Sequence, residues 1–251
     1  MSLAPQCRGG YQAQAAKLRL LLQRRTRLGY LEMDLEEIWC IREEDVYPTL
    51  FGPNSRGIFP LSAELFSARF RQQEIDPRWL FYGIIEFGPT EARPCWLYAT
   101  SGHSNPWDWD DGVRQDEVDT SSGAGVEFLF ASTRQGDWAI TYLQNMLAFD
   151  ILLSAGRFQG RGPLGVGDRI PLRAPISGKA DCVLRNAIVS HPETFPSGFA
   201  LPSGRVDFLT FTGVTDDEIS FAKANGTPDL IERLLAAGAY PITDPTRRSV
   251  I

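Results

Sequence analysis

The sequence predicts an α+β fold, with one compact domain in which a mixed, largely antiparallel sheet is covered by helices. Short β-rich runs bounded by turn residues alternate with segments whose apolar residues have helical spacing. The 251 residues, 43% of them apolar, are enough to bury a large core. Residues 138–156 come closest to a membrane span, but they include Gln144, Asn145 and Asp150. We therefore expect a buried helix there and no membrane association.

The first elements are predicted to be helices. Apolar spacing over residues 34–43 indicates a helix that ends near Pro48 and Gly52. A second helix follows Pro60, with Ser62 as its expected N-cap.

The middle of the chain is predicted to alternate strands with one long helix. Runs 79–87 and 94–100 are joined by the turn GPTEAR, which indicates an antiparallel hairpin. The elements expected after this hairpin are a strand over 126–132, a helix over 137–154, a glycine-rich connector, and strands over 169–173, 182–189 and 206–212.

The clearest helix start lies near the C-terminus. Thr215 and Glu218 have the spacing of a capping box, and the acidic residues between them favour the positive end of the helix. We expect this helix to be interrupted near Gly226 and followed by another over 228–237, which ends at Gly238.

The first 32 residues differ in charge from the rest. They carry a net charge of +5, and the remainder carries −11. Arginine-rich, acid-poor composition is typical of targeting segments. The alternative is that translation begins at Met33. We favour a basic extension over 1–32 that is peripheral or non-native, and a folded domain over 33–251.

Composition also limits the partners. The net charge of −11 after residue 32 repels phosphates, so we expect no nucleic-acid partner. A basic protein partner is compatible with this charge. The four cysteines form no C-x-x-C pair and histidines are not clustered, so we expect neither a metal site nor a disulfide framework, and no motif indicates a cofactor. No secretory signal is recognisable, and cytoplasmic localisation is favoured.

An enzyme is the alternative hypothesis. Residues 102–106 approach the G-x-S-x-G elbow of hydrolases, with Ser104 as nucleophile and His191 as the histidine that has the required chain order. The last position is proline where the elbow needs a small residue. We therefore expect no catalytic residues and no enzymatic activity.

The motif WLYATSGHSNPW at 96–107 is similar to a signature of the suppressor of fused family. The resemblance continues in the same order over roughly residues 36–250. It is carried by SSGAGVEFLF (121–130), WAITYLQNMLAF (138–149), FLTFTGVTDDEISFAK (208–223) and AYPITDPTRRSV (239–250).

This resemblance implies a compact α+β domain that binds a protein. Single-domain bacterial relatives are associated with polymorphic toxin loci, which implies an immunity protein that binds and neutralises a cognate toxin. Asp168 coincides with an acidic residue in the peptide-binding groove of animal relatives. Asp150 stands where those relatives carry a peptide-contacting tyrosine, which departs from their pattern. Trp107 and Trp109 are further candidates for partner binding, with a structural role as the alternative.

Overall fold

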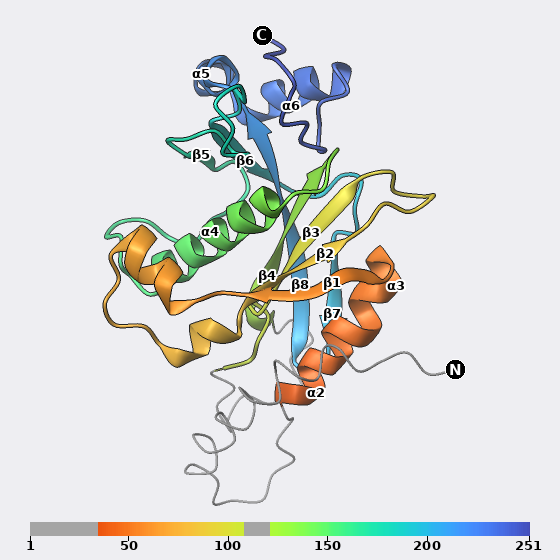
Figure 1. Ribbon diagram of the computed structural model, residues 1–251, viewed down its shortest axis with the longest axis vertical. Helices are drawn as coiled ribbons and strands as arrows, with labels where there is room; N and C mark the ends of the chain where they lie inside the picture. The colour runs from red at the N-terminus through yellow and green to blue at the C-terminus, as the bar shows by residue number, and fades with distance from the viewer. Residues whose placement is uncertain (1–34, 108–120) are drawn as a thin grey trace, which may run out of the picture.

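The computed structural model describes residues 35–107 and 121–251. One mixed sheet forms the centre of the molecule, and helices lie on both of its faces (Figure 1). The elements in chain order are α2 (Leu35–Cys40), η1 (Ile41–Val46), α3 (Tyr47–Phe51), β1 (Asn54–Pro60), η2 (Leu65–Arg69), η3 (Pro77–Phe81), β2 (Gly83–Phe87), β3 (Trp96–Ser101), β4 (Ser121–Ser132), α4 (Asp137–Ser154), β5 (Arg169–Pro171), β6 (Asn186–Ser190), β7 (Gly198–Leu201), β8 (Gly204–Val214), α5 (Asp216–Asn225) and α6 (Thr227–Ala236).

The sheet confirms the predicted mixed, largely antiparallel architecture. Its strand order is β1-β2-β3-β4-β8-β6-β5, and β7 pairs with β8 beside this path. Strands β4 and β8 are parallel, and the other pairs of named strands in the described chain are antiparallel. Both β4 and β8 are central and mostly buried, so the two layers of helices pack against them.

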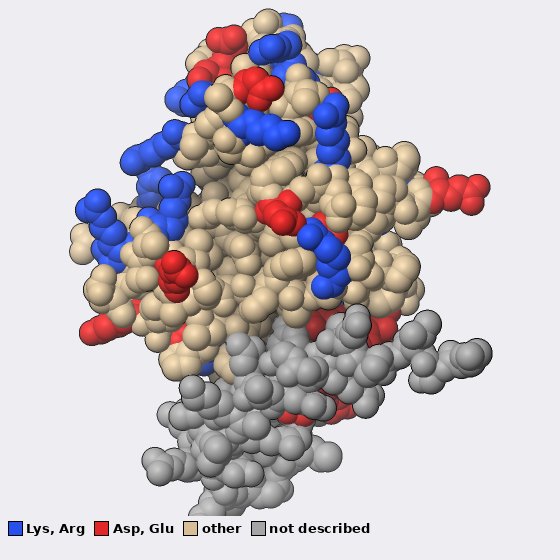
Figure 2. Space-filling model, viewed as in Figure 1, with Lys and Arg blue, Asp and Glu red and all other residues tan. Residues whose placement is uncertain are grey.

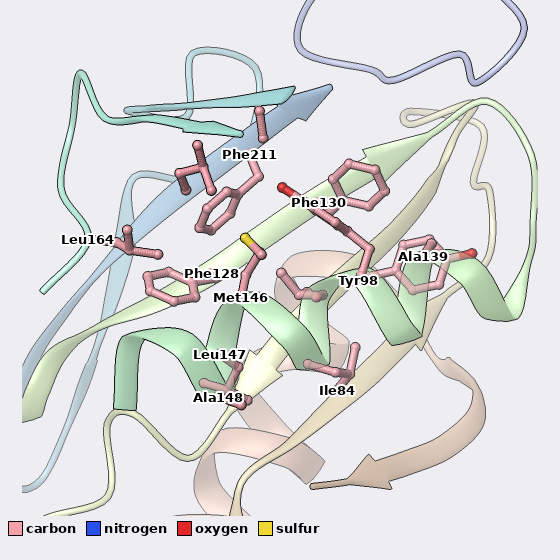
Figure 3. Packing of buried hydrophobic residues seen from close by; sticks show 14 of the residues in the cluster. Ile84, Tyr98, Phe128, Phe130, Ala139, Met146, Leu147, Ala148, Leu164 and Phe211 are labelled. Atoms are coloured by element: carbon pink, nitrogen blue, oxygen red, sulfur yellow. The ribbon is translucent and has the colours of Figure 1, made fainter. Parts of the chain in front are cut away.

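Helix α4 covers one face of the sheet. Phe128 and Phe130 of β4 and Phe211 of β8 point toward Met146 of this helix (Figure 3). Burial of one such phenylalanine contributes about 1.5–3 kcal/mol. Eleven of the 18 residues of α4 are buried, which confirms the prediction of a buried helix.

The other face packs against the helical segment 35–51. Leu129 and Ala131 alternate with the two phenylalanines of β4, so they face Tyr47 and Phe51 instead. Within this segment η1 is a stretch of π-helix, and it carries Arg42 into the interior. The predicted single helix is therefore a continuous run of three helical pieces that ends at Gly52.

Several predicted boundaries were wrong. The start of the run at 79–87 is the short 3-10 helix η3, because Asp76 caps it and Pro77 begins it. Strand β4 begins five residues early, at Ser121, through a glycine-rich part with a register shift. Strands β1 and β7 were not predicted, because glycine and proline interrupt them or only four residues form them.

The C-terminal helices match the prediction closely. The Thr215–Glu218 capping box forms, and α5 and α6 are separated at Gly226. Leu230 and Leu234 of α6 pack against Ile188 and Val214 at one end of the sheet.

Two of the three described cysteines, Cys95 and Cys182, are buried. Cys40 is exposed because Ile38 and Trp39 occupy the inner face of α2.

Candidate functional site

The segment 102–107 after β3 folds inward. Gly102 has a φ of +137°, and a Cβ added there would lie 2.7 Å from the Tyr82 ring. A Cβ on Gly123 would lie 2.5 Å from the carbonyl oxygens of His103 and Asn105. Only glycine fits at these two positions, which lets β4 pass directly beside the loop.

The polar side chains of this loop meet a buried ion pair. Arg42 and Glu127 are both fully buried, and Arg42 Nη1 lies 3.9 Å from Glu127 Oε1. The guanidinium donates to Ser101 Oγ, Ser104 Oγ and Asn105 Oδ1, each at 2.9 Å. We call these five residues the buried polar network.

The Glu127 carboxylate accepts four hydrogen bonds. The amides of Gly102 and Ser104 donate to its Oε1 at 3.0 Å, and Ser104 Oγ donates to the same oxygen at 2.6 Å. Thr100 Oγ1 donates to Oε2 at 2.5 Å. A buried carboxylate with this many donors fixes the direction in which the chain leaves β3.

Electrostatics keep Arg42 charged. Burial alone would lower the pKa of its guanidinium, but the charges of Glu127 and Glu43 raise that pKa above its usual value. Glu43 Oε1 also accepts from Arg42 Nη2 at 3.2 Å and from Ser101 Oγ at 2.5 Å. The network therefore holds permanent charges, which require internal partners when buried.

His103 points to the opposite face of the sheet. Its ring packs edge-on against Tyr82 and Phe128, with centroids 5.6 and 5.0 Å away. Its Nε2 lies 3.3 Å from Asp150 Oδ2 of α4, an ion-pair distance without the direction of a hydrogen bond. Asp150 Oδ1 also accepts from the amide of Leu164 at 2.5 Å. These contacts connect the loop, α4 and the glycine-rich connector.

Burial raises the pKa of the Asp150 carboxyl, although His103 and the Leu164 amide both oppose this rise. Only 1% of Asp150 is exposed, so it is an internal residue of the fold.

The predicted hydrolase residues do not form a reaction centre. Ser104 is fully buried, and its hydroxyl bonds to Glu127 and Arg42. His191 is exposed beyond the end of β6, and its carbonyl accepts from the Tyr240 hydroxyl. Among the described residues no hydrogen bond links Ser104 to either histidine.

The C-terminal motif also serves the fold. Arg247 donates two bonds to the Glu218 carboxylate, at 2.5 and 2.7 Å, and a third to the carbonyl of Gly213 at 2.8 Å. Glu218 is thus shared between the cap of α5 and the chain end.

A large groove lies along the flank of α4 that faces β5 and the connector after α4. It has a volume of about 1360 Å³ and runs between α4, the end of η2 and the connector 157–178. Its large, partly exposed apolar side chains are Phe70, Trp138, Phe149, Phe158 and Leu172. Its basic side chains, all exposed, are Arg69, Arg157, Arg161, Arg169 and Arg173. We call this feature the α4 groove.

The predicted partner-binding residues lie in different places. Asp168 lines the α4 groove, is exposed, and accepts from the Gly165 amide at 2.8 Å. Trp107 is half-buried on Phe81, and its Nε1 donates to the Tyr82 hydroxyl at 3.2 Å. Asp150 lies inside the protein, next to the connector. Trp109 is outside the described residues.

The sequence interpretation missed the arginines of the groove. Four of them fall within 157–173, where the only acidic residue is Asp168. A local charge count would have found this basic stretch. The contribution of Arg69, which is distant in sequence, required the fold.

The described residues contain no candidate membrane span and no candidate metal site. Within residues 35–107 and 121–251, no helix is long and apolar enough to cross a membrane. In the same ranges, no group of three or more histidine, cysteine or acidic residues has the arrangement of a metal site.

Comparison with solved structures shows the same fold in suppressor of fused proteins. Drosophila suppressor of fused has 22% sequence identity and a TM-score of 0.52, over 67% of this chain and 42% of that protein's chain. A chain of the Sufu–Fu complex has 21% identity and a TM-score of 0.56, over 86% of this chain and 91% of that one. A protein from Neisseria gonorrhoeae FA 1090 that is described as a SUFU homolog has 16% identity and a TM-score of 0.48, over 68% of this chain and 78% of that one, and the fold comparison does not depend on it.

Of two sequence comparisons, the one with family models supports the same assignment. The search of curated proteins gave no match. The family model described as Suppressor of fused protein (SUFU) matches residues 80–248, about two-thirds of the chain. This range includes the loop after β3, Glu127, α4 and the Glu218–Arg247 pair. The chain therefore belongs to the suppressor of fused family.

Proposed function

We propose that this chain is a non-enzymatic protein-binding module, and that it acts in the cytoplasm as an immunity protein of a bacterial polymorphic toxin system. In this role it binds a cognate toxin and neutralises it. The α4 groove is the observation that carries the proposal. A volume of about 1360 Å³ with partly exposed aromatic side chains is large enough for a segment of another protein.

Family membership supports a binding role. A similar chain was solved in the Sufu–Fu complex, which is an assembly with a protein partner. The polar residues of the loop after β3 form hydrogen bonds inside the fold, whereas the arginines and aromatic side chains of the α4 groove are exposed or partly exposed.

The net charge of −11 over residues 33–251 favours a basic toxin domain, because opposite charge accelerates encounter. Asp168 at the edge of the groove is the acidic residue that we propose to contact the partner. Trp107 and Trp109 are proposed to contact the partner. Asp150 is proposed to act by positioning the connector through Leu164.

Co-expression with the toxin of the neighbouring reading frame tests this function. We expect the wild-type chain to restore growth and to co-purify with the toxin. A chain starting at Met33 should protect equally, because we place residues 1–32 outside the functional domain. Asp168→Ala should weaken toxin binding, and Asp181→Ala, an exposed acid that does not line the groove, should not. Failure of the wild-type chain to protect would exclude the immunity role.

A further inference from the structure

The α4 groove has the opposite charge to the protein as a whole. Five arginines and one aspartate line it, whereas the described residues together carry 18 basic and 23 acidic side chains. Figure 2 shows basic side chains gathered along the left side of the view. In Figure 1, which is drawn from the same direction, α4 and the connector after it lie on this side.

The charges of these arginines are not neutralised by carboxylates of the described residues. Within the described chain Arg69, Arg157, Arg161 and Arg173 form no ion pair with a carboxylate. Arg169 donates to the carbonyl of Ala222 at 2.8 Å, and a carbonyl does not neutralise its charge. Unpaired arginines around a concave surface attract carboxylates, which they bind with two parallel hydrogen bonds.

Two polar atoms of α4 also lack partners. The hydroxyl of Tyr142 and Oδ1 of Asn145 are buried and have no hydrogen bond within residues 35–107 and 121–251, and Tyr142 is only 5% exposed. Both residues line the groove and lie one helical turn apart. A buried polar atom without a partner is costly, so these two atoms favour a ligand that donates or accepts hydrogen bonds, as a polypeptide backbone does.

The backbone at the rim is constrained as well. Arg173 has a φ of +61°, in the left-handed region that residues other than glycine seldom adopt. Such positions persist where the surrounding structure holds them, and they cluster at binding sites.

We infer that the α4 groove binds an extended polypeptide segment that alternates acidic and large apolar side chains. The apolar side chains pack on Phe149 and Phe158, the carboxylates meet the arginine rim, and the backbone bonds to Tyr142 and Asn145. A nucleic acid fits this groove less well, because its floor is apolar and the rest of the protein repels phosphates.

This inference rests on the proposed function and specifies the part of the partner that is recognised. A basic toxin domain suits the protein's overall charge during encounter. The segment of the toxin that enters the groove is acidic and apolar, and the basic residues of the toxin that Asp168 contacts flank this segment at the edge of the groove.

Labelled peptides test the chemistry directly. The probes are three short peptides labelled with fluorescein. All three carry leucine or phenylalanine at every second position, and the positions between are glutamate in the first, glutamine in the second and lysine in the third. Their binding is measured by fluorescence anisotropy at low and high salt. We expect the glutamate peptide to bind most tightly and to lose affinity at high salt. Equal binding of the glutamine peptide, or tighter binding of the lysine peptide, would overturn the inference.

Variants locate the site. The double variant Arg157→Gln/Arg161→Gln should weaken the glutamate peptide about five- to tenfold, as expected for the loss of two exposed ion pairs. The matched control is Arg205→Gln/Arg248→Gln, which removes two exposed charges outside the groove and should not change binding. Tyr142→Phe should weaken binding a few-fold with an unchanged melting temperature. An unchanged affinity in the first variant, or tighter binding of a single-stranded oligonucleotide that needs the same arginines, would contradict the inference.

The toxin assay separates this inference from the proposed function. If the wild-type chain does not protect from the toxin but binds the glutamate peptide in the groove, the immunity role fails and the groove chemistry stands. If the wild-type chain and the double arginine variant protect equally and no peptide preference appears, the groove inference fails and the immunity role stands.

Discussion

The buried polar network and the α4 groove differ in the burial and pairing of their arginines. Arg42 is fully buried and surrounded by Glu127, Glu43 and three side-chain acceptors. The arginines of the groove are exposed, and four have no carboxylate partner within the described chain. In the network only the amide nitrogen of Asn105 lacks a bond among the described atoms. The difference indicates that the first group maintains the fold and the second is available to a ligand.

The largest predicted effect comes from removing the charge inside the network. Arg42→Ala leaves the Glu127 carboxylate buried without its ion pair, so we expect a loss of about 3–5 kcal/mol in the free energy of unfolding. Chemical denaturation measures this loss. Arg205→Ala is the control, because Arg205 pairs with Asp207 at the surface and should change stability by less than about 0.5 kcal/mol. A loss below about 1 kcal/mol for Arg42→Ala would contradict the structural role of the network.

The close contact between β4 and the loop gives the second prediction. Gly123→Ala introduces a Cβ 2.5 Å from two carbonyl oxygens at a φ of +57°, so we expect destabilisation of about 1–3 kcal/mol. The added Cβ of Gly162→Ala in the connector meets no atom of the described residues within 4 Å, so this substitution should be neutral. Thermal unfolding of both proteins compares the two regions. Equal melting temperatures would show that the loop tolerates movement.

Two buried tyrosines test whether hydroxyl groups near the network and in the groove differ in their hydrogen bonding. Tyr47 donates to the carbonyl of Thr100 at 2.6 Å, whereas the Tyr142 hydroxyl has no hydrogen-bond partner in the part of the chain that the structure describes. We expect Tyr47→Phe to cost about 1 kcal/mol and Tyr142→Phe to cost nothing or to stabilise slightly. The free energies of unfolding measure both changes. A similar cost for Tyr142→Phe would mean that its hydroxyl is satisfied inside the folded protein and is not available to a ligand.

The smallest predicted effect is a pH trend at Asp150. Burial raises its pKa in the folded state, so its contribution to stability is greatest below the unfolded pKa and is lost as pH rises through the folded pKa. The melting temperature of Asp150→Asn minus that of the wild type should therefore increase with pH over the acid range. Asp76→Asn should show the opposite trend, because hydrogen bonds from the Arg78 side chain lower the pKa of Asp76. A difference for Asp150→Asn that falls with pH would contradict this assignment.

Parts of the candidate site were visible in the sequence, and others were not. The motif at 96–107 was identified from the sequence, and Asp150 and Asp168 were identified as candidate partner-binding residues. The direction in which the motif's side chains point was not predictable, because it depends on Arg42, which is 62 residues before Ser104 in the chain. The same limit applies to Arg69, which η2 brings to the groove.

Local interactions determined what the sequence alone predicted correctly. The Thr215–Glu218 cap, the buried helix α4 and the β2–β3 hairpin each depend on residues that are neighbours along the chain. Strands β1 and β7, the buried Arg42–Glu127 pair and the α4 groove depend on contacts between distant segments. Only the tertiary structure decided these features, because contacts and charge pairs between segments that are distant in the chain leave no local pattern in the sequence.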